Sequence, residues 1–175
     1  MNTLIANEII ALRALEPADA DVIYRWENDT SHWADSDIIA PYSRQMLTEY
    51  IAAYNTDIYS QRQLRMMAVL ADTGEPVGLV DFSSFDPMNN RSELGLLIAP
   101  LVRHRGYGSH ILSLALNYAQ NHIGLRQLYA LIRCDNEASL SLLKKHGFMR
   151  SGILEKWIRR GKDYYDVEIL QNVFS

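Results

Sequence analysis

The hydrophobic positions along the chain follow two periods, one typical of strands and the other typical of helices. Short segments in which apolar side chains alternate with polar ones, or follow one another without interruption, predict strands. Polar turn signals at 72–75, 86–90 and 159–162 separate several of these segments. The expected strands cover 9–15, 66–71, 77–85, 92–99, 127–133, 148–158 and 164–173.

Apolar side chains spaced three and four positions apart predict four helices. The first opens at Pro17, because proline is tolerated in the first helical turn. The second begins after Ser43, whose hydroxyl suits an N-cap, and the third begins near Ser109. The fourth covers 135–145 and is closed by Gly147, since glycine readily adopts the left-handed conformation at a helix end.

The order of these elements is strand, two helices, three strands, helix, strand, helix and two strands. It predicts an α/β (α+β) fold in which antiparallel hairpins are combined with one parallel crossover. A length of 175 residues suits one domain with a substantial core, so we expect residues 1–175 to form a single domain.

Composition and charge exclude several classes of protein. The chain is 48% hydrophobic and 22% charged, as in ordinary globular proteins, and its net charge of -4 disfavours a nucleic-acid partner. A single cysteine, Cys134, excludes an internal disulfide and a cysteine-rich zinc site, and the histidines show no ligand spacing, so we expect no metal. No apolar segment resembles a signal peptide or a bilayer span, so we expect no membrane partner and a cytoplasmic setting.

Residues 103–108 read Arg-His-Arg-Gly-Tyr-Gly and join an expected strand to an expected helix. The N–H groups at a helix start attract anions, and glycines let the backbone approach a ligand closely, so this turn predicts a phosphate site. A P-loop lysine is missing, and Ile111 stands where a dinucleotide fingerprint needs its third glycine. The alternative is a tight structural turn with two incidental arginines.

The turn also fits a longer pattern. Arg103-x-x-Gly106-x-Gly108 matches the R/Q-x-x-G-x-G/A signature of the GCN5-related N-acetyltransferases, and Asn136 and Ser139, followed by 145–148, match that family's N-x-x-S…K-x-G-F element. The segments 12–20 and 161–167 are similar to the branch that acetylates ribosomal-protein N-termini and contains spermidine acetyltransferases. The resemblance covers about 9–170.

The resemblance implies a mixed, mostly antiparallel sheet of six to seven strands, splayed at the acyl-CoA site and flanked by about four helices. It implies acetyl-CoA as cosubstrate, with its pyrophosphate in the turn and its pantetheine arm in the splay. By position, backbone groups of Leu96, Leu97 and Ile98 line the arm, Asn136 meets the pantetheine, and Lys145 reaches a phosphate. The pyrophosphate turn comprises Arg103, His104, Arg105, Gly106, Tyr107, Gly108 and Ser109.

Acetylation requires a neutral amine, so a general base is expected. The resemblance places an acid at Glu93, whose alternative interpretation is a solvated glutamate at a strand end. Many relatives carry a tyrosine as general acid where this chain has Leu143, so Ser141 and Tyr164 are the remaining candidates, unless no acid is needed. An acyl-enzyme on Cys134 is disfavoured, because no histidine stands at a recognisable spacing.

The sequence therefore predicts an acetyl-CoA-dependent N-acetyltransferase that transfers acetyl directly to a primary amine. The acceptor is a protein N-terminus or a small amine such as a polyamine, and a homodimer is the assembly suggested by the branch. Acids at 27–29 and at Asp35 and Asp37 are candidates for binding a cationic acceptor. The alternative interpretation of this segment is an ordinary polar loop. The competing interpretation is a non-catalytic CoA-binding or regulatory module of the same fold, which Leu143 favours.

Overall fold

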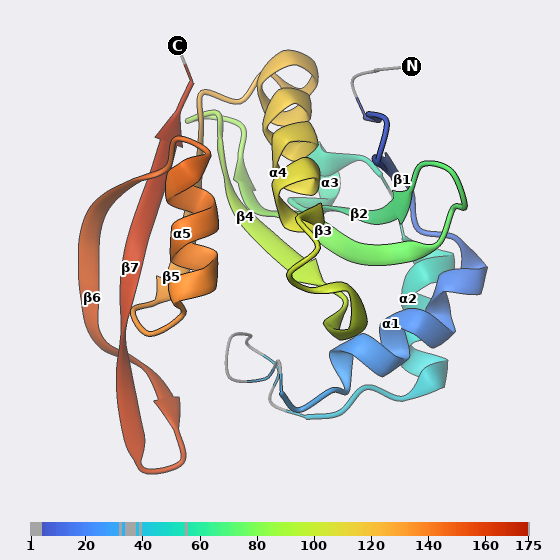
Figure 1. Ribbon diagram of the computed structural model, residues 1–175, viewed down its shortest axis with the longest axis horizontal. Helices are drawn as coiled ribbons and strands as arrows, with labels where there is room; N and C mark the ends of the chain where they lie inside the picture. Colours follow the sequence, from blue (N-terminus) through green and yellow to red (C-terminus); the bar gives the residue numbers. More distant parts are fainter. Residues whose placement is uncertain (1–4, 32, 34–37, 39, 55, 175) are drawn as a thin grey trace.

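A computed structural model describes residues 5–31, 33, 38, 40–54 and 56–174. Seven strands form one sheet in the order β1-β2-β3-β4-β5-β7-β6, and every neighbouring pair is antiparallel except β4 and β5 (Figure 1). The strands are β1 (Ile10–Arg13), β2 (Leu64–Leu70), β3 (Pro76–Asp86), β4 (Arg91–Ile98), β5 (Gln127–Arg133), β6 (Met149–Arg160) and β7 (Asp163–Val173). The α-helices are α1 (Ala20–Glu27), α2 (Arg44–Ala53), α3 (Ile58–Gln61), α4 (Tyr107–Tyr118) and α5 (Glu137–Lys145).

Local sequence signals set several helix ends. Ser43 Oγ accepts a hydrogen bond of 3.0 Å from the Met46 N–H, which caps α2 as expected. Asn136 Oδ1 caps α5 in the same way, at 3.1 Å from the Ser139 N–H. Gly147 follows α5 with φ of +86°, which confirms the left-handed residue predicted at that helix end.

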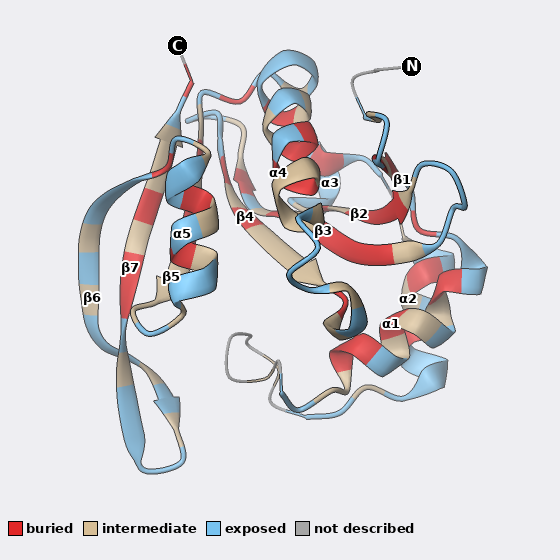
Figure 2. Cartoon of the chain, viewed as in Figure 1, coloured by how far each residue is buried: buried red, intermediate tan, exposed pale blue. Residues whose placement is uncertain are grey.

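The sheet is covered on both faces, and the alternation of side chains along β4 shows which residues face which helices. Leu94, Leu96 and Ile98 belong to the larger core, which includes buried side chains of α4 and α5. Leu97 packs into a second core formed with α1 and α2. Figure 2 shows buried positions on both groups of helices and on the strands between them. By the period of two, Glu93 shares the α1/α2 face of the sheet with Leu97.

The parallel pairing of β4 and β5 is short. It comprises Arg91 with Gln127, Ser92 with Leu128, and Glu93 with Tyr129. Beyond Glu93 the two strands diverge, so the described chain forms two lobes, β1–β4 on one side and β5, β7 and β6 on the other (Figure 1). The splayed sheet implied by the resemblance is thereby confirmed.

The clearest differences between the observed and the predicted elements involve three helices. The first was expected from Pro17, but Pro17–Asp19 form a 3-10 turn and α1 begins at Ala20. Helix α3 was not predicted, because a single turn is too short to show a helical period; Asp57 caps it by accepting from the Tyr59 N–H at 3.0 Å. Helix α4 begins at Tyr107, two residues earlier than expected, and continues into a π-helical turn, Ala119–Ile123. Among the helices of the described residues, none has the length and apolar character needed to cross a bilayer.

Candidate active site

The turn after β4 has the geometry of an anion site. His104 and Gly106 both adopt left-handed conformations, with φ of +63° and +84°, and α4 begins at the next residue, Tyr107. A Cβ placed on Gly106 would meet nothing within 4 Å, so the space above the turn is open. Glycine is therefore favoured at this position by the left-handed backbone conformation and not by crowding. The Ser109 N–H donates to the Gly106 carbonyl at 3.1 Å, whereas the N–H groups that precede it at the start of a helix have no partner four residues earlier in the helix and can bind phosphate oxygens.

Gly108 has a different role from Gly106. A Cβ on Gly108 would lie 3.2 Å from Cδ2 of Leu142 and 3.7 Å from Ile98, so its missing side chain lets the first turn of α4 pack against α5 and β4. Ser109 Oγ lies 2.7 Å from His146 Nε2 beside this contact. Burial, together with the charge of Lys145, lowers the pKa of His146, which keeps the ring neutral near pH 7. No pattern in the sequence connects His146 with the turn.

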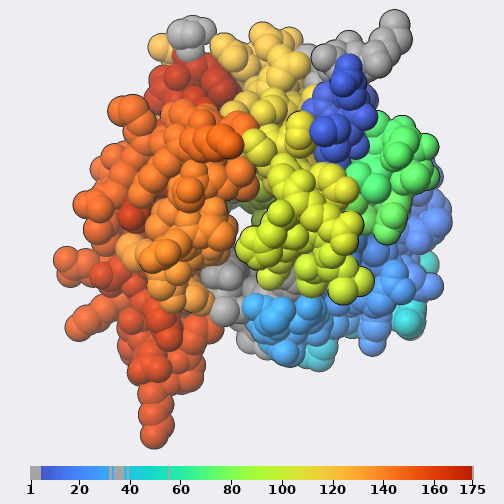
Figure 3. All heavy atoms as spheres, in the orientation of Figure 1, coloured from blue at the N-terminus to red at the C-terminus, as the bar shows by residue number. Residues whose placement is uncertain are grey.

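The edge of β4 fits an extended amide-containing chain. Leu96, Leu97 and Ile98 pair with β3 along one edge, and the other edge faces the space where β4 and β5 diverge. Figure 3 shows a hollow between the β4–α4 turn, in yellow-green, and the α5 region, in orange. A ligand whose amide groups run along that edge can bond to the β4 backbone, much as an added strand does.

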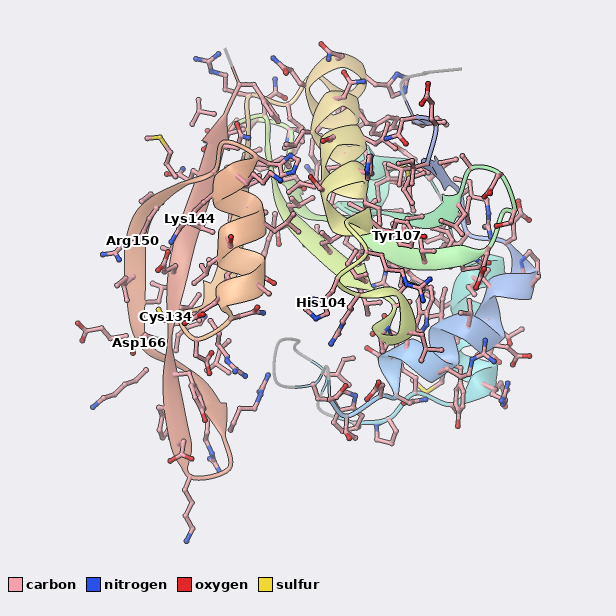
Figure 4. All side chains as sticks on the ribbon, viewed as in Figure 1. His104, Tyr107, Cys134, Lys144, Arg150 and Asp166 are labelled. Atoms are coloured by element: carbon pink, nitrogen blue, oxygen red, sulfur yellow. The ribbon has the colours of Figure 1, made fainter. Side chains whose placement is uncertain are left out.

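The second lobe supplies the other wall of this space. Because the cap on α5 uses Asn136 Oδ1, the Nδ2 group of Asn136 is the part that can donate to a ligand carbonyl. Lys145 is exposed in the last turn of α5. Figure 4 shows His104 and Tyr107 on the β4–α4 side and Cys134 on the opposite side. Burial and the nearby Glu168 raise the pKa of the Cys134 thiol, which opposes a role as nucleophile.

Glu93 stands at the closed end of the diverging strands. It is the last residue of β4 in register with β5, directly opposite Tyr129. The side chain of Tyr129 is hydrogen-bonded to those of Glu93 and Ser84, and burial raises its pKa, with the charge of Glu93 adding to the effect. The phenol is therefore protonated near neutral pH. The sequence had not singled out Tyr129, since tyrosine is common in strands.

The two candidate acids do not lie beside Glu93. Ser141 is exposed on α5, whereas Leu143, at the usual tyrosine position, is 4% exposed and packs into the core. Tyr164 is 56% exposed at the start of β7 and shares its face of the strand with Glu168, which forms an ion pair with Lys144 of α5 at 3.1 Å. Glu93 lies on the other face of the sheet. The structure thus brings neither candidate together with the expected base.

A charged cluster lies on the α1/α2 face beyond Glu93. Arg65 Nε donates to Asp81 Oδ1 at 2.7 Å, and its NH1 group donates to Glu27 Oε1 at 3.0 Å. Burial acts to lower the pKa of Arg65, but the two carboxylates outweigh it and raise the pKa, so the guanidinium stays charged. Gln63 also donates to Asp81 Oδ1, at 3.2 Å.

A cavity of about 330 Å³ opens beside this cluster and is lined by Glu27, Tyr42, Met46, Leu47, Tyr50, Gln63 and Arg65. The buried hydroxyl of Tyr50 has no hydrogen-bond partner among the described residues, and burial raises its pKa to about 12. Two carboxylates against one guanidinium leave a formal charge of about -1 around the cluster. Of the acids predicted to bind a cationic acceptor, Glu27 lies here, whereas Asp35 and Asp37 lie outside the described residues.

A second cavity, of about 280 Å³, is lined by Arg91, Gln127, Tyr129, Ile169 and Gln171. Over the described ranges, no three His, Cys, Asp or Glu side chains are placed so that they could hold a metal ion. The functional groups of the site are therefore carboxylates, a guanidinium, phenols and backbone amides.

Comparisons with known proteins agree with this geometry. The sequence model of the acetyltransferase (GNAT) domain matches residues 10–149. The uncharacterized N-acetyltransferase YoaA of Bacillus subtilis is 26% identical over 97% of this chain and 96% of its own length. Spermidine N(1)-acetyltransferase of Vibrio cholerae is 26% identical over 96% of each chain. The crystal structure of the Vibrio cholerae spermidine N-acetyltransferase with CoA and spermine shares the fold, with a TM-score of 0.85 at 24% identity over 95% of this chain and 96% of that chain.

The family match covers most of the chain, from the first strand to the start of β6. The relatives are named as acetyltransferases, which favours an enzyme over the non-catalytic CoA-binding module. The protein therefore belongs to the GNAT acetyltransferase family and is an acetyl-CoA-dependent N-acetyltransferase that acetylates an amine.

Proposed function

We propose that the acceptor is a small amine with more than one positive charge, such as a polyamine, and that a protein N-terminus is not the acceptor. The observation that carries this proposal is a pair of carboxylates, Glu93 and Asp81, which lie on one face of adjacent strands with the small residues Gly95 and Ser83 at the other two corners. Asp81 is in register with Gly95, and Ser83 is in register with Glu93, so the two acids form a diagonal pair. Such positions lie about 7–8 Å apart, a span that a short alkyl diamine covers.

Gly95 keeps the surface between the two acids open. A Cβ on Gly95 would lie 3.3 Å from Asp81 Cβ and 4.0 Å from Asp81 Oδ2, so any larger residue would crowd the carboxylate. Arg65 and Gln63 occupy Asp81 Oδ1, and Oδ2 lies toward Gly95. A second ammonium group of the acceptor would meet this oxygen while the reacting amine lies at Glu93.

The relatives support the same acceptor class. The matched proteins of Vibrio cholerae and Escherichia coli are named spermidine N(1)-acetyltransferases. One Vibrio cholerae structure, with a TM-score of 0.80 at 25% identity, is described as dodecameric. We propose that this chain also assembles with copies of itself, and a homodimer is the smallest such assembly. Light scattering of the enzyme in solution distinguishes a homodimer from a larger assembly.

In the proposed reaction, Glu93 takes the proton and the acceptor reacts directly. Acetyl-CoA supplies an activated thioester, held by the β4 edge, the turn Arg103–Ser109 and Asn136, with Lys145 near a phosphate. The neutral amine attacks the thioester carbonyl, the C–N bond forms, the C–S bond breaks, and the amine proton passes to Glu93 directly or through water. The sulfur leaves as a thiolate. The roles of Ser141 and Tyr164 as general acids stay predictions, and neither residue adjoins Glu93.

An amine panel tests the acceptor class. We expect turnover with spermidine or spermine, and weak or no turnover with peptides that carry a free N-terminus. Asp81→Asn should raise KM about tenfold for a polyamine and leave a monoamine of equal length unaffected, because about 1.4 kcal/mol of attraction to the second charge is lost. Asp72→Asn, in an exposed hairpin turn, is the control. A higher kcat/KM for a peptide than for every polyamine would overturn the proposal.

The turn itself is tested by acetyl-CoA binding. Gly106→Val forces a β-branched side chain into φ of +84°, and we expect at least a tenfold weaker Kd by calorimetry. Arg103→Ala should weaken binding about three- to tenfold, because a charge-assisted contact to phosphate is lost. Gly124→Val is the matched control, since Gly124 has φ of +77° and equally open surroundings away from the site. Unchanged Kd in both variants of the turn would reject the phosphate site.

A further inference from the structure

Tyr129 occupies a distinctive place at the junction of the two lobes. It is the residue of β5 opposite Glu93, at the last pair before the strands diverge. Its neighbours Leu128 and Ala130 point into the core under α4 and α5, so Tyr129 points to the face that carries Glu93. The side chain hydrogen-bonds to Glu93 and to Ser84. A carboxylate only accepts hydrogen bonds, so the phenol O–H donates to Glu93, and the Ser84 hydroxyl donates to the phenol oxygen.

The backbone around Ser84 supports this arrangement. Ser84 has φ of +50°, a left-handed conformation that is uncommon outside glycine, and it lies where the β3–β4 register shifts between Ser83 and Asp86. A bulge of this kind redirects a side chain, and bulges gather near active sites. The buried Ser92 fixes the adjoining backbone by donating from Oγ to the Ser83 carbonyl at 2.6 Å.

We propose that Tyr129, supported by Ser84, is a positioning residue for Glu93, which it holds in the ionised form and in a fixed orientation for proton transfer. This inference rests on the proposed function, in which Glu93 is the base. The register at the end of the β4–β5 pairing carries it, because that register brings a phenol from one lobe against the carboxylate of the other. Tyr129 itself does not touch the reacting atoms.

Few charged side chains lie beside Tyr129 and Glu93. From β4, Arg91 lies near Tyr129, but its NH2 group is 3.2 Å from Asp86 Oδ2 in an ion pair. From β3, Asp81 lies one diagonal position from Glu93 and is bonded to Arg65. From β7, Ile169 and Gln171 carry no charge, and with Tyr129 they line the cavity of about 280 Å³.

The test is the pH profile of Tyr129→Phe. A hydrogen bond donated to a carboxylate favours its charged form, so its loss makes the carboxylate easier to protonate. We therefore expect the acidic limb of the kcat/KM profile to move about one pH unit upward and kcat near pH 7 to fall about tenfold. Ser84→Ala should shift the limb in the same direction by a smaller amount. The KM for acetyl-CoA should stay unchanged in both variants.

Two controls separate this role from a structural one. Tyr118→Phe removes another half-buried phenol, which lies on α4 against His122, and its pH profile should match that of the unaltered enzyme. In a Glu93→Gln background, Tyr129→Phe should cause no further loss, because the carboxylate it positions is gone. A loss in kcat without a shift of the limb would reduce Tyr129 to a structural residue and overturn the inference.

The Glu93→Gln variant also separates the inference from the proposed function. If Glu93→Gln is inactive and Tyr129→Phe keeps the original pH profile, the inference fails while the proposed base stands. If Glu93→Gln retains activity and its acidic limb, the proposed base is wrong and the inference falls with it.

Discussion

Replacing Glu93 with glutamine is expected to lower kcat by a factor of about 10²–10⁴ at pH 7, the usual contribution of a general base. Glutamine keeps the size of the side chain and its place opposite Tyr129 but cannot accept the amine proton. An aliphatic amine with a pKa near 10.4 is almost entirely protonated at pH 7, so the unaided enzyme would depend on the small neutral fraction. The deficit should therefore shrink as the pH rises toward 9.

The measurement is the initial rate of CoA release with a polyamine at saturating acetyl-CoA, from pH 6 to 9. Calorimetry should give an unchanged Kd for acetyl-CoA, because Glu93 lies at the closed end of the diverging strands, away from the pyrophosphate turn. Glu75→Gln, at an exposed hairpin turn, is the control for loss of a carboxylate as such. A kcat within about threefold of the original at every pH would show that another group accepts the proton.

Arg65→Met should cause the largest loss of stability, about 3–5 kcal/mol, because it leaves two enclosed carboxylates without their cation. The side chains of Arg65, Glu27 and Asp81 are 19%, 11% and 18% exposed, so water compensates little. The loss corresponds to a fall in Tm of about 6–20 °C for a domain of this size. It should diminish as the pH falls toward 4, since protonation removes the uncompensated charge.

Thermal unfolding followed by circular dichroism measures this effect. Arg62→Met is the control, because Arg62 is an exposed residue that directly follows α3, two positions before β2, and it should change Tm by no more than about 2 °C. The triple variant Arg65→Met, Glu27→Gln, Asp81→Asn should recover much of the loss, because no charge is left unpaired. A Tm for Arg65→Met equal to that of the control would show that the cluster does not stabilise the fold.

Signals that act within a few residues were sufficient for most of the fold. Ser43 and Asn136 cap their helices with their own side chains, and Gly147 ends α5, so these boundaries followed from the sequence. Strand β5 was predicted over its observed residues, because its apolar run at 128–132 is short and ends in a polar residue on each side. The one-turn helix α3 has no period to detect, and its cap at Asp57 is weak evidence on its own.

The candidate site was predictable only where it depends on a contiguous motif. Residues 103–108 predict the phosphate turn, but Arg65 meets its partners Glu27 and Asp81 across 38 and 16 positions of sequence. No local pattern distinguishes an arginine that will be enclosed in a strand from one that will be solvated. Tyr129 was missed for the same reason, since its partner Glu93 belongs to the other lobe and becomes its neighbour only through the parallel register.

The short pairing of β4 with β5 has a consequence for the cohesion of the molecule. Only three residue pairs join β4 to β5, and the rest of the connection between the lobes is the core that α4 and α5 share and the contact of Gly108 with α5. A cosubstrate that lies along both walls, as proposed, would add to this connection. Binding to the folded state adds RT ln(1 + [L]/Kd) to the free energy of unfolding, about 2.7 kcal/mol at a hundredfold excess over Kd. Saturating acetyl-CoA is therefore expected to raise the Tm of this enzyme as well as to supply its acetyl group.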